Sequence, residues 1–203
     1  NWLAQQHFTQ SSPTFTMKAI LVNYKTDPTW LKNYPELDVT LYERTENPNY
    51  DLTEYGQVIL TPNRGDVDHD KLTYLIENYD NLPEIFLWGK SNLFKYVDEG
   101  DFQKALEKKE FAPLLKFDHR IYDDRFGQVN MYRGNMYYER ADDWLFNNPD
   151  LAKKYYTSWD QWCLEFGLPR EAYIPFAPGG NYFLTKERVH RYSRDLYIQM
   201  RDT

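Results

Sequence analysis

Residues 57–92 carry the pattern that most constrains how this chain can fold. Residues 58–60 are a short apolar run, and the turn formers at residues 62–65 end it. Apolar side chains then recur at helical spacing over residues 72–79, in a segment whose first turn is rich in aspartate. Residues 85–88 are a second apolar run, as expected of a strand buried on both faces. The stretch therefore predicts a βαβ unit.

The two strands of this unit predict where a ligand would bind. Parallel strands joined by a right-handed crossover end at the same edge of a sheet, and ligands of open α/β sheets bind outside that carboxyl edge. Polar loops follow both strands, at residues 63–66 and at residues 89–92. For one βαβ unit alone, ordinary solvated loops explain these residues better than a ligand site does. The prediction of a site therefore depends on the rest of the chain.

The chain before this unit predicts two more strands. Residues 18–24 form an apolar strand, after which Asp27 is expected to cap a helix that opens at Pro28. Residues 38–44 alternate between apolar and polar side chains and predict a second strand. The resulting order is strand, helix, strand, loop, strand, helix, strand. This order is typical of a nucleotide-binding α/β half.

The chain after residue 92 has a different pattern. Helical spacing gives way to an irregular stretch rich in Asp, Arg and Gly, which we expect to form loops at the edge of a site. The segments expected here are helices at residues 93–97 and 101–109, loops at 116–135, a helical region around Pro149 at 142–168, a Gly-Gly turn and strand at 175–184, and a closing amphipathic helix at 186–201.

Composition limits the classes of function. The 203 residues suit one domain with a full core. A net charge of −7 argues against a general nucleic-acid or anionic-membrane surface, although it leaves room for a local basic pocket. Cys163 is the only cysteine, which excludes an internal disulfide and a cysteine-rich zinc site. The abundant Tyr, Trp and Phe suit sugar rings and nucleobases, but core packing explains most of them.

The start of the chain is expected to lie outside the domain. Residues 1–16 lack the basic start and apolar centre of a signal peptide, and Met17 resembles an original start. No apolar run approaches membrane-spanning length. We therefore expect an N-terminal extension at residues 1–16 and one soluble, cytoplasmic domain at residues 17–203, with no membrane span and no nucleic-acid partner.

The order of four motifs resembles the glycosyltransferases of the GT-A fold, which use sugar nucleotides as donors. In that resemblance, Asn23 and Tyr24 occupy the base-binding end of the first strand, and Asn63-Arg64-Gly65 occupies the next conserved loop of the family. Gly89-Lys90-Ser91 stands in the slot of the metal-binding Asp-x-Asp motif. Gly179-Gly180-Asn181 resembles the Gly-rich acceptor-side segment that precedes a helix. The order of the motifs, rather than any one of them, carries the resemblance.

Two narrower resemblances point the same way. Residues 75–82 are similar to a bacterial and fungal family of uncharacterised glycosyltransferase-like domains. The chain over residues 17–200 resembles the first domain of the multi-domain glycosyltransferases of large algal (chlorella) viruses, which act in capsid glycosylation. This kinship implies host cytoplasm as the location and further domains in a longer chain.

The resemblance implies a fold and an activity. The fold would be α/β and GT-A-like (Rossmann-type), a single domain with a mostly parallel central sheet flanked by helices. Residues 17–92 would form its nucleotide-binding half and residues 93–203 its acceptor-side half. The activity would be transfer of a sugar from a nucleoside diphosphate donor, expected to be a UDP-sugar, to a glycan or glycoprotein acceptor. The open alternative is a non-catalytic carbohydrate- or nucleotide-sugar-binding module.

The resemblance also implies a divalent cation, Mn²⁺ or Mg²⁺. Because Gly89-Lys90-Ser91 replaces Asp-x-Asp, the candidate ligands become Ser91, Asp68 and His190, the last because such transferases often bring a ligand from their C-terminal part. A diphosphate leaving group takes up negative charge, which a cation or the side chains of Lys90 and Arg64 would counter.

Asp160 is the candidate catalytic base. It lies between Trp159 and Trp162, which would form a platform for a sugar ring. A helix buried by two tryptophans and capped by polar residues would have the same sequence, and this structural interpretation is the favoured one. The motifs of the common serine hydrolases, P-loop kinases and zinc proteases are absent from the sequence.

Overall fold

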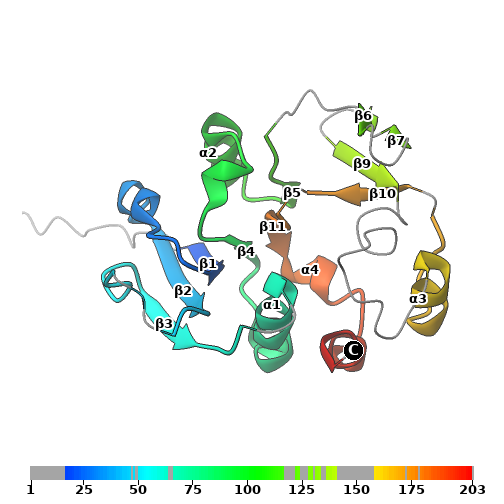
Figure 1. Cartoon of the computed structure of the whole chain (residues 1–203), viewed down its shortest axis with the longest axis horizontal. Coiled ribbons are helices and arrows are strands. Elements are labelled where there is room, and N and C mark those ends of the chain that lie inside the picture. Colours follow the sequence, from blue (N-terminus) through cyan, green and yellow to red (C-terminus); the bar gives the residue numbers. More distant parts are fainter. Residues whose placement is uncertain are drawn as a thin grey trace, which may run out of the picture.

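The predicted βαβ unit is present as β3 (Gln57–Leu60), α1 (Asp66–Glu77) and β4 (Ile85–Lys90) (Figure 1). The predicted extension at residues 1–16 lies outside the described residues, as do parts of the later chain. The computed structural model describes residues 17–46, 48, 50–63, 66–116, 122–123, 128–129, 131–133, 136–140, 158–171, 173–177 and 179–202.

The central sheet has six strands, and four adjacent strands in it run parallel to one another. They lie in the order β3-β2-β1-β4, where β1 is Met17–Asn23 and β2 is Leu37–Glu43. The register sets Asn23 beside Glu43, and the Ser91 N–H donates to the Val22 carbonyl at 3.0 Å. The carboxyl ends of β1, β2 and β4 are therefore level with one another at one edge of the sheet.

The prediction of a mostly parallel sheet is wrong, because the sheet is mixed. β11 (Tyr182–Thr185) pairs antiparallel with β4, and β5 (Ala112–Pro113) pairs antiparallel with β11. Gly179 and Gly180 have φ angles of 77° and 65°, a left-handed conformation that reverses the chain just before β11. An apolar run in the sequence predicts a strand but does not encode its direction, which this turn sets.

Both predicted halves contribute to this one sheet. β5 and β11 come from the later half of the chain, yet they extend the sheet that the earlier half begins. The described residues thus form a single α/β domain with a mixed six-stranded sheet.

The helices lie close to their predicted positions, but their type or number differs from the prediction. A 3-10 helix, η1 (Thr29–Asn33), replaces the expected α-helix, and its N-cap is Pro28 without a side-chain cap. The predicted capping role of Asp27 is therefore wrong, and its carboxylate instead accepts from the Tyr55 hydroxyl at 2.8 Å. The expected closing helix is two helices, α4 (Lys186–Val189) and α5 (Arg194–Asp202). The other helices are η2 (Tyr79–Asn81), η3 (Leu93–Lys95), α2 (Glu99–Lys108) and α3 (Trp159–Glu165).

The region expected to form loops, residues 116–135, contains the short strands β6 (Tyr122–Asp123), β7 (Gln128–Val129) and β8 (Met131–Arg133). β6 pairs with β7, and β8 joins β9 (Met136–Arg140) and β10 (Tyr173–Phe176), which lie outside that region, in a three-stranded sheet. Strands of two or three residues are too short to produce a periodic signal in the sequence. Most of the predicted helical region around Pro149 lies outside the described residues, and α3 confirms its later part.

Apolar clusters cover both faces of the sheet, which is why β1 and β4 are almost continuously apolar. On one face, Leu21 and Leu87 pack with Phe102 of α2. On the other face, Phe86 and Trp88 pack with Leu75 of α1. Apolar packing on both faces holds the sheet between α2 and α1.

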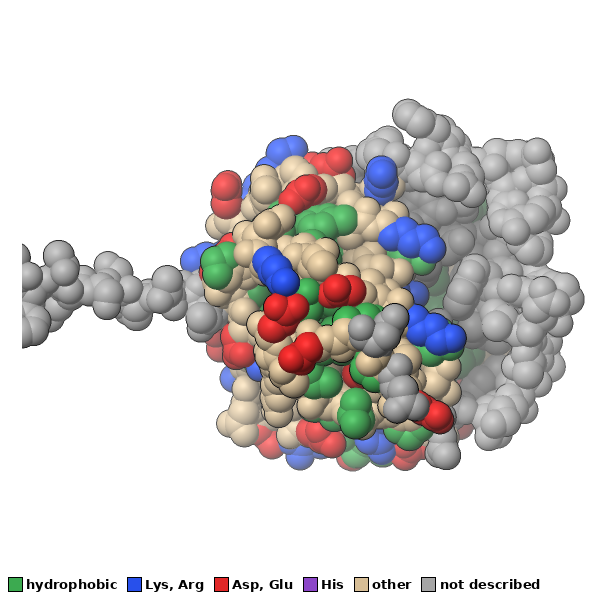
Figure 2. Space-filling model, turned by 60° about the vertical axis from the view of Figure 1, so that its left-hand side comes forward, with side chains coloured by type: hydrophobic (Ala, Val, Ile, Leu, Met, Phe, Trp, Pro, Cys, Tyr) green, Lys and Arg blue, Asp and Glu red, His purple; other side chains and the backbone are tan. Residues whose placement is uncertain are grey.

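The surface carries both signs of charge. Figure 2 shows the face that lies on the left in Figure 1. On this face, acidic and basic side chains are interspersed with polar and hydrophobic ones. Among the described residues, none of the helices has the length and apolar character needed to cross a lipid bilayer.

Candidate functional site

Buried polar side chains gather at the carboxyl edge of the parallel strands. Of the eight buried polar or charged residues in the described part of the chain, seven lie there, and Thr40 inside β2 is the exception. Burying such groups is costly unless each is paired, so an ordinary core avoids concentrating them. Their concentration at one edge indicates a functional site. The seven are Asn23, Glu43, Arg44, Asp70, Lys71, Ser91 and Asn181.

A chain of hydrogen bonds ties the ends of three strands together at this edge. The Ser91 hydroxyl donates to Asn23 Oδ1, and Asn23 Nδ2 donates to Glu43 Oε2 at 2.6 Å. Glu43 Oε1 accepts from the Thr45 N–H at 2.5 Å. Asn23 and Ser91 were predicted to bind the ligand, but their side chains are buried and bonded to each other. Their side chains hold the edge together, behind the residues that face solvent.

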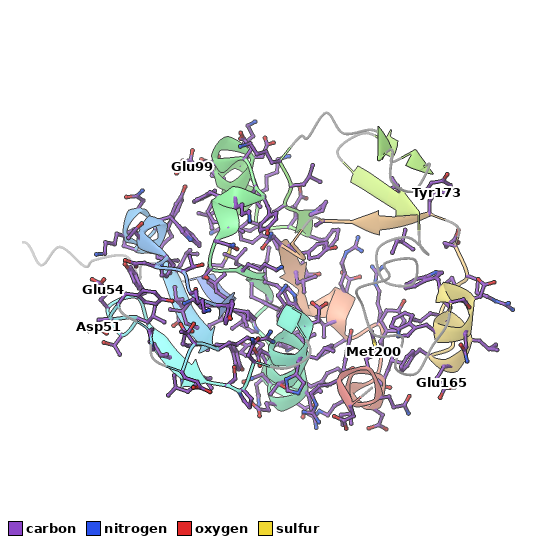
Figure 3. The ribbon with its side chains drawn as sticks, in the orientation of Figure 1. Asp51, Glu54, Glu99, Glu165, Tyr173 and Met200 are labelled. Atoms are coloured by element: carbon purple, nitrogen blue, oxygen red, sulfur yellow. The ribbon has the colours of Figure 1, made fainter. Side chains whose placement is uncertain are left out.

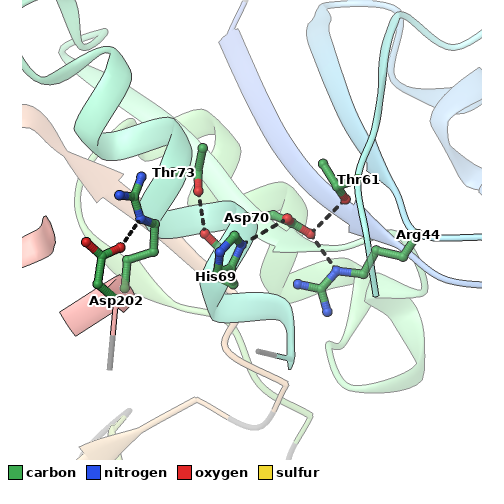
Figure 4. A network of polar contacts seen from close by, with 7 residues as sticks. Arg44, Thr61, His69, Asp70, Thr73 and Asp202 are labelled. Carbon is green, nitrogen blue, oxygen red and sulfur yellow. Dashed lines mark hydrogen bonds and ion pairs between the residues drawn. The ribbon is translucent and has the colours of Figure 1, made fainter. Parts of the chain in front are cut away.

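A buried ion pair joins the end of β2 to α1 (Figure 4). Arg44 Nε lies 2.5 Å from Asp70 Oδ2, and the two side chains are 3% and 2% exposed. Thr61 Oγ1 donates to the same carboxylate oxygen at 3.3 Å. His69 Nδ1 lies 3.6 Å from the other oxygen, which is an ion pair only when the imidazole is protonated. Asp70 is therefore held from two sides, and it holds Arg44 in turn.

A pocket of about 220 Å³ opens at this edge. Residues that follow all four parallel strands line it: Tyr24 after β1, Arg44 after β2, Asn63 after β3, and Ser91 after β4. Lys90, at the end of β4, adds a second cation, and its Nζ lies 5.6 Å from the centre of the Tyr96 ring, which also lines the pocket. The described residues that line the pocket include two cations and no carboxylate, although the chain has a net charge of −7.

The structure brings four of the predicted donor-binding residues into this pocket: Tyr24, Asn63, Lys90 and Ser91. Tyr24 is 49% exposed, so its ring is accessible to a ligand. The other two residues of the predicted loop, Arg64 and Gly65, lie outside the described residues.

The predicted acceptor-side segment lies beside the same edge. Lys71 Nζ, on the fully buried side chain of Lys71, donates to the Gly180 carbonyl at 2.6 Å. Asn181 Oδ1 accepts from the Lys90 N–H at 2.9 Å. Gly179 and Gly180 have positive φ angles, which accounts for two adjacent residues without Cβ at this turn. The acceptor-side and donor-side segments are thus neighbours in space.

The three predicted metal ligands are not brought together. Asp68 is exposed on α1 near Gly180. The pKa of the neighbouring Tyr182 phenol is raised, mainly because the phenol is buried and to a smaller extent because of the negative charge of Asp68. The Ser91 hydroxyl is engaged with Asn23. His190 follows α4 at the amino edge, where its Nε2 lies 2.7 Å from the Tyr79 carbonyl oxygen. The described residues contain no group of three or more His, Cys, Asp or Glu side chains that could hold a metal ion. Asp68 is the one predicted ligand with an exposed carboxylate at the carboxyl edge.

Asp160 lies away from the pocket. It is exposed in the first turn of α3, and Trp159 stacks on Trp162 with ring centres 4.9 Å apart. In Figure 1 and Figure 3, α3, with Glu165 at its end, lies on the right of the molecule, and β11 and α4 stand between it and the parallel strands β1, β2 and β3. The structure therefore does not bring the predicted base to the carboxyl edge.

Sequence reasoning missed the charged residues that are buried at this edge. Glu43 and Arg44 come directly at the end of a strand that must run beside β1, and that position was a usable signal. Asp70 and Lys71 lie near the start of α1, where charged side chains are typical of an exposed helix N-terminus. Only their contacts with Arg44 and Gly180 distinguish them from solvated helix residues.

The chain has no significant match among protein-family models, curated proteins or solved structures. Its function is therefore inferred from the residues gathered at the carboxyl edge.

Proposed function

We propose that this protein is a glycosyltransferase of GT-A-like fold that binds a nucleoside diphosphate sugar, expected to be a UDP-sugar, at the carboxyl edge of its sheet. The observation that carries the proposal is the pocket where four parallel strands end, whose described lining includes Arg44 and Lys90 and no carboxylate, in an acidic protein. Such a pocket attracts an anion. The strand order β3-β2-β1-β4 supports it further, since it is the order of a nucleotide-binding half.

Each pocket residue has a role in this proposal. Tyr24 offers an exposed aromatic face on which a base can stack, and Lys90 offers charge to the diphosphate. The volume of about 220 Å³ is smaller than the roughly 300–1,000 Å³ of typical small-molecule sites. It therefore receives one part of the donor, and the sugar extends toward Gly179 and Gly180, which adjoin Lys90 through Asn181.

The proposed reaction moves one glycosyl group. The bond between the anomeric carbon and the diphosphate oxygen breaks, and its electron pair stays with the diphosphate. An acceptor hydroxyl oxygen forms the new bond to that carbon, and its proton passes to an oxygen of the departing diphosphate. Lys90 stabilises the charge that develops on the leaving group. A Mn²⁺ or Mg²⁺ ion would add counter-charge there, held by the Asp68 carboxylate together with the donor phosphates.

Lys90 and Lys95 allow a matched test of the pocket. Both ammonium groups lie near the Tyr96 ring, at 5.6 and 5.4 Å from its centre, but only Lys90 lines the pocket. We expect Lys90→Met to weaken UDP binding about tenfold in calorimetric titration, and Lys95→Met to leave it unchanged. Equal affinities of both variants and the wild type for UDP would show that the donor binds elsewhere.

Turnover decides between the enzyme and the non-catalytic module. The position of Asp160, away from the pocket, favours the module, whereas the adjoining glycine segment favours transfer. A panel of nucleotide sugars, incubated with manganese or with excess chelator and followed by release of nucleoside diphosphate, distinguishes the two. The enzyme hydrolyses one donor slowly and faster with metal. The module binds a donor without release.

A further inference from the structure

A second pocket lies on the face of the sheet that α1 covers, and we call it the apolar pocket. Its volume of about 370 Å³ falls within the roughly 300–1,000 Å³ of typical small-molecule sites. None of the described residues that line it also lines the pocket at the carboxyl edge. Met200 of α5, which Figure 3 labels, is one of its walls. The described lining residues are Leu72, Leu75, Trp88, Phe111, Leu168, Tyr182, Leu184, Arg188, Val189, Tyr192, Leu196, Tyr197 and Met200.

The walls of the apolar pocket suit an apolar ligand better than water. The Ala177 N–H donates to the Tyr182 hydroxyl at 3.1 Å, and the Tyr197 hydroxyl donates to the Val189 carbonyl at 2.8 Å. These two hydroxyls are thus engaged within the protein, whereas a water in a cavity needs two to four polar partners. α5 has no fully buried side chain, so its apolar residues keep surface that a ligand can cover.

Arg188 is the only charged side chain among the described residues that line the apolar pocket. It is exposed, and its guanidinium carbon lies 3.7 Å from the centre of the Phe111 ring. No carboxylate of the described residues lies within ion-pair distance of it, whereas nearby Arg191 pairs with Glu187 at 3.0 Å. Tyr192 beside it is 44% exposed. The pocket therefore combines apolar walls with one uncompensated cation at its mouth.

This combination is complementary to a ligand with an apolar chain and one anionic end. A guanidinium that stacks on a ring by its face keeps its N–H donors in its own plane, where they match the two oxygens of a carboxylate. The pocket volume of about 370 Å³ equals that of roughly twelve water molecules in the liquid, which suits a chain of about ten carbons.

We infer that the apolar pocket binds a fatty acid of medium chain length and that Arg188 holds its carboxylate. The chain lies on the α1 face of the sheet, against Trp88 and Leu196. Because the two pockets share no described lining residue, the inference does not depend on the proposed function.

Calorimetric titration with decanoate tests the inference, with decanamide and decyltrimethylammonium as neutral and cationic probes of the same chain length. Arg188→Gln removes the cation from an exposed position and leaves the core untouched. Arg191→Gln is its matched control, because Arg191 does not line the described pocket. Leu196→Gln places a polar group in the pocket, and Ile198→Gln is its control, since Ile198 is also half-buried on α5 but does not line the described pocket.

The expected result is selective binding of the anionic probe. Decanoate binds the wild type at one site, at least about tenfold more tightly than the other two probes. Arg188→Gln and Leu196→Gln each weaken decanoate binding about tenfold, and both controls stay within about twofold of the wild type. Saturating UDP leaves the decanoate affinity within about twofold. If the α5 variants do not fold, the pair of arginine variants decides the outcome.

Four results would overturn the inference. They are no decanoate binding by the wild type, equal affinity for the three probes, unchanged decanoate affinity in Arg188→Gln, and displacement of decanoate by UDP, which would place decanoate at the carboxyl edge. Sedimentation of the same samples tests a second copy of the chain as the occupant. A dimer that decanoate does not bind and that Leu196→Gln dissociates would overturn the inference in favour of that copy. None of these results bears on UDP binding through Lys90.

Discussion

Ion pairs at the amino edge and at the carboxyl edge of the parallel strands differ in exposure, and β2 takes part in one pair at each edge. Near its start, Asp38 pairs with Lys18 of β1 at 3.2 Å, and the side chains are 58% and 20% exposed. Just beyond its end, Arg44 pairs with Asp70, and both side chains are almost completely buried. The amino edge leaves its ion pairs in contact with water, whereas the carboxyl edge removes them from it.

This difference separates ion pairs that stay in contact with water from an ion pair that the fold buries. Exposed pairs contribute little to stability and tolerate substitution. Buried charges need a partner at every atom, and removing one partner is costly. A protein that needed only stability would place its charged residues as the amino edge does. The carboxyl edge departs from that pattern, which is why we propose it as the functional site.

The largest expected effect is loss of the carboxylate that holds Arg44. Asp70→Asn leaves a buried guanidinium without its counter-charge, so we expect the free energy of unfolding to fall by about 3–5 kcal/mol. Urea denaturation followed by circular dichroism measures it. A loss below about 1 kcal/mol would mean that the carboxyl edge behaves like the amino edge and that the contrast is wrong.

Two glycines with nearly equal φ angles isolate the contact at the carboxyl edge. Gly180 has φ 65° and an added Cβ would lie 3.0 Å from Lys71 Nζ, whereas Gly167 has φ 64° and nothing within 4 Å. Alanine costs about 1–2 kcal/mol at either position through its left-handed backbone. We expect Gly180→Ala to cost about 1–3 kcal/mol more, because it displaces the buried ammonium from the Gly180 carbonyl. Equal losses in urea denaturation would show that Lys71 adapts without penalty.

Substitution of Tyr24 tests whether an exposed residue of the carboxyl edge affects ligand binding without affecting the stability of the fold. Its ring is half exposed and lines the pocket. We expect Tyr24→Ala to weaken UDP binding about tenfold, as loss of base stacking does, while the free energy of unfolding changes by less than about 0.5 kcal/mol. Calorimetry and urea denaturation on the same preparation measure both quantities. Unchanged affinity for UDP would remove Tyr24 from the site.

The smallest expected effect is at the amino edge. Lys18→Met breaks the pair with Asp38, which remains in contact with water. We expect a loss of less than about 1 kcal/mol and no change in UDP affinity. A loss comparable with that of Asp70→Asn would contradict the distinction between the two edges.

Local patterns in the sequence predict four strands of the sheet, its main helix and part of the candidate site. β1, β2, β3, α1 and β4 lie where local apolar patterns predict them, because burial on one or two faces leaves a periodic trace in the chain. Tyr24, Asn63, Lys90 and Ser91 were predictable because each lies at the end of a strand or in the loop after it, and these parallel strands end at a common edge.

Only the tertiary structure decided the rest. Arg44 and Asp70 are 26 residues apart, and Asn23 and Ser91 are 68 apart, so no local pattern reveals their contacts. The antiparallel direction of β11 depends on a two-glycine turn that Lys71 of α1 holds. Separation of Asp160 and His190 from the pocket likewise follows from how α3 and α4 pack, not from their neighbours in sequence. Local patterns record which side chains are buried, whereas the partners of a buried charge are chosen by the fold that brings distant segments together.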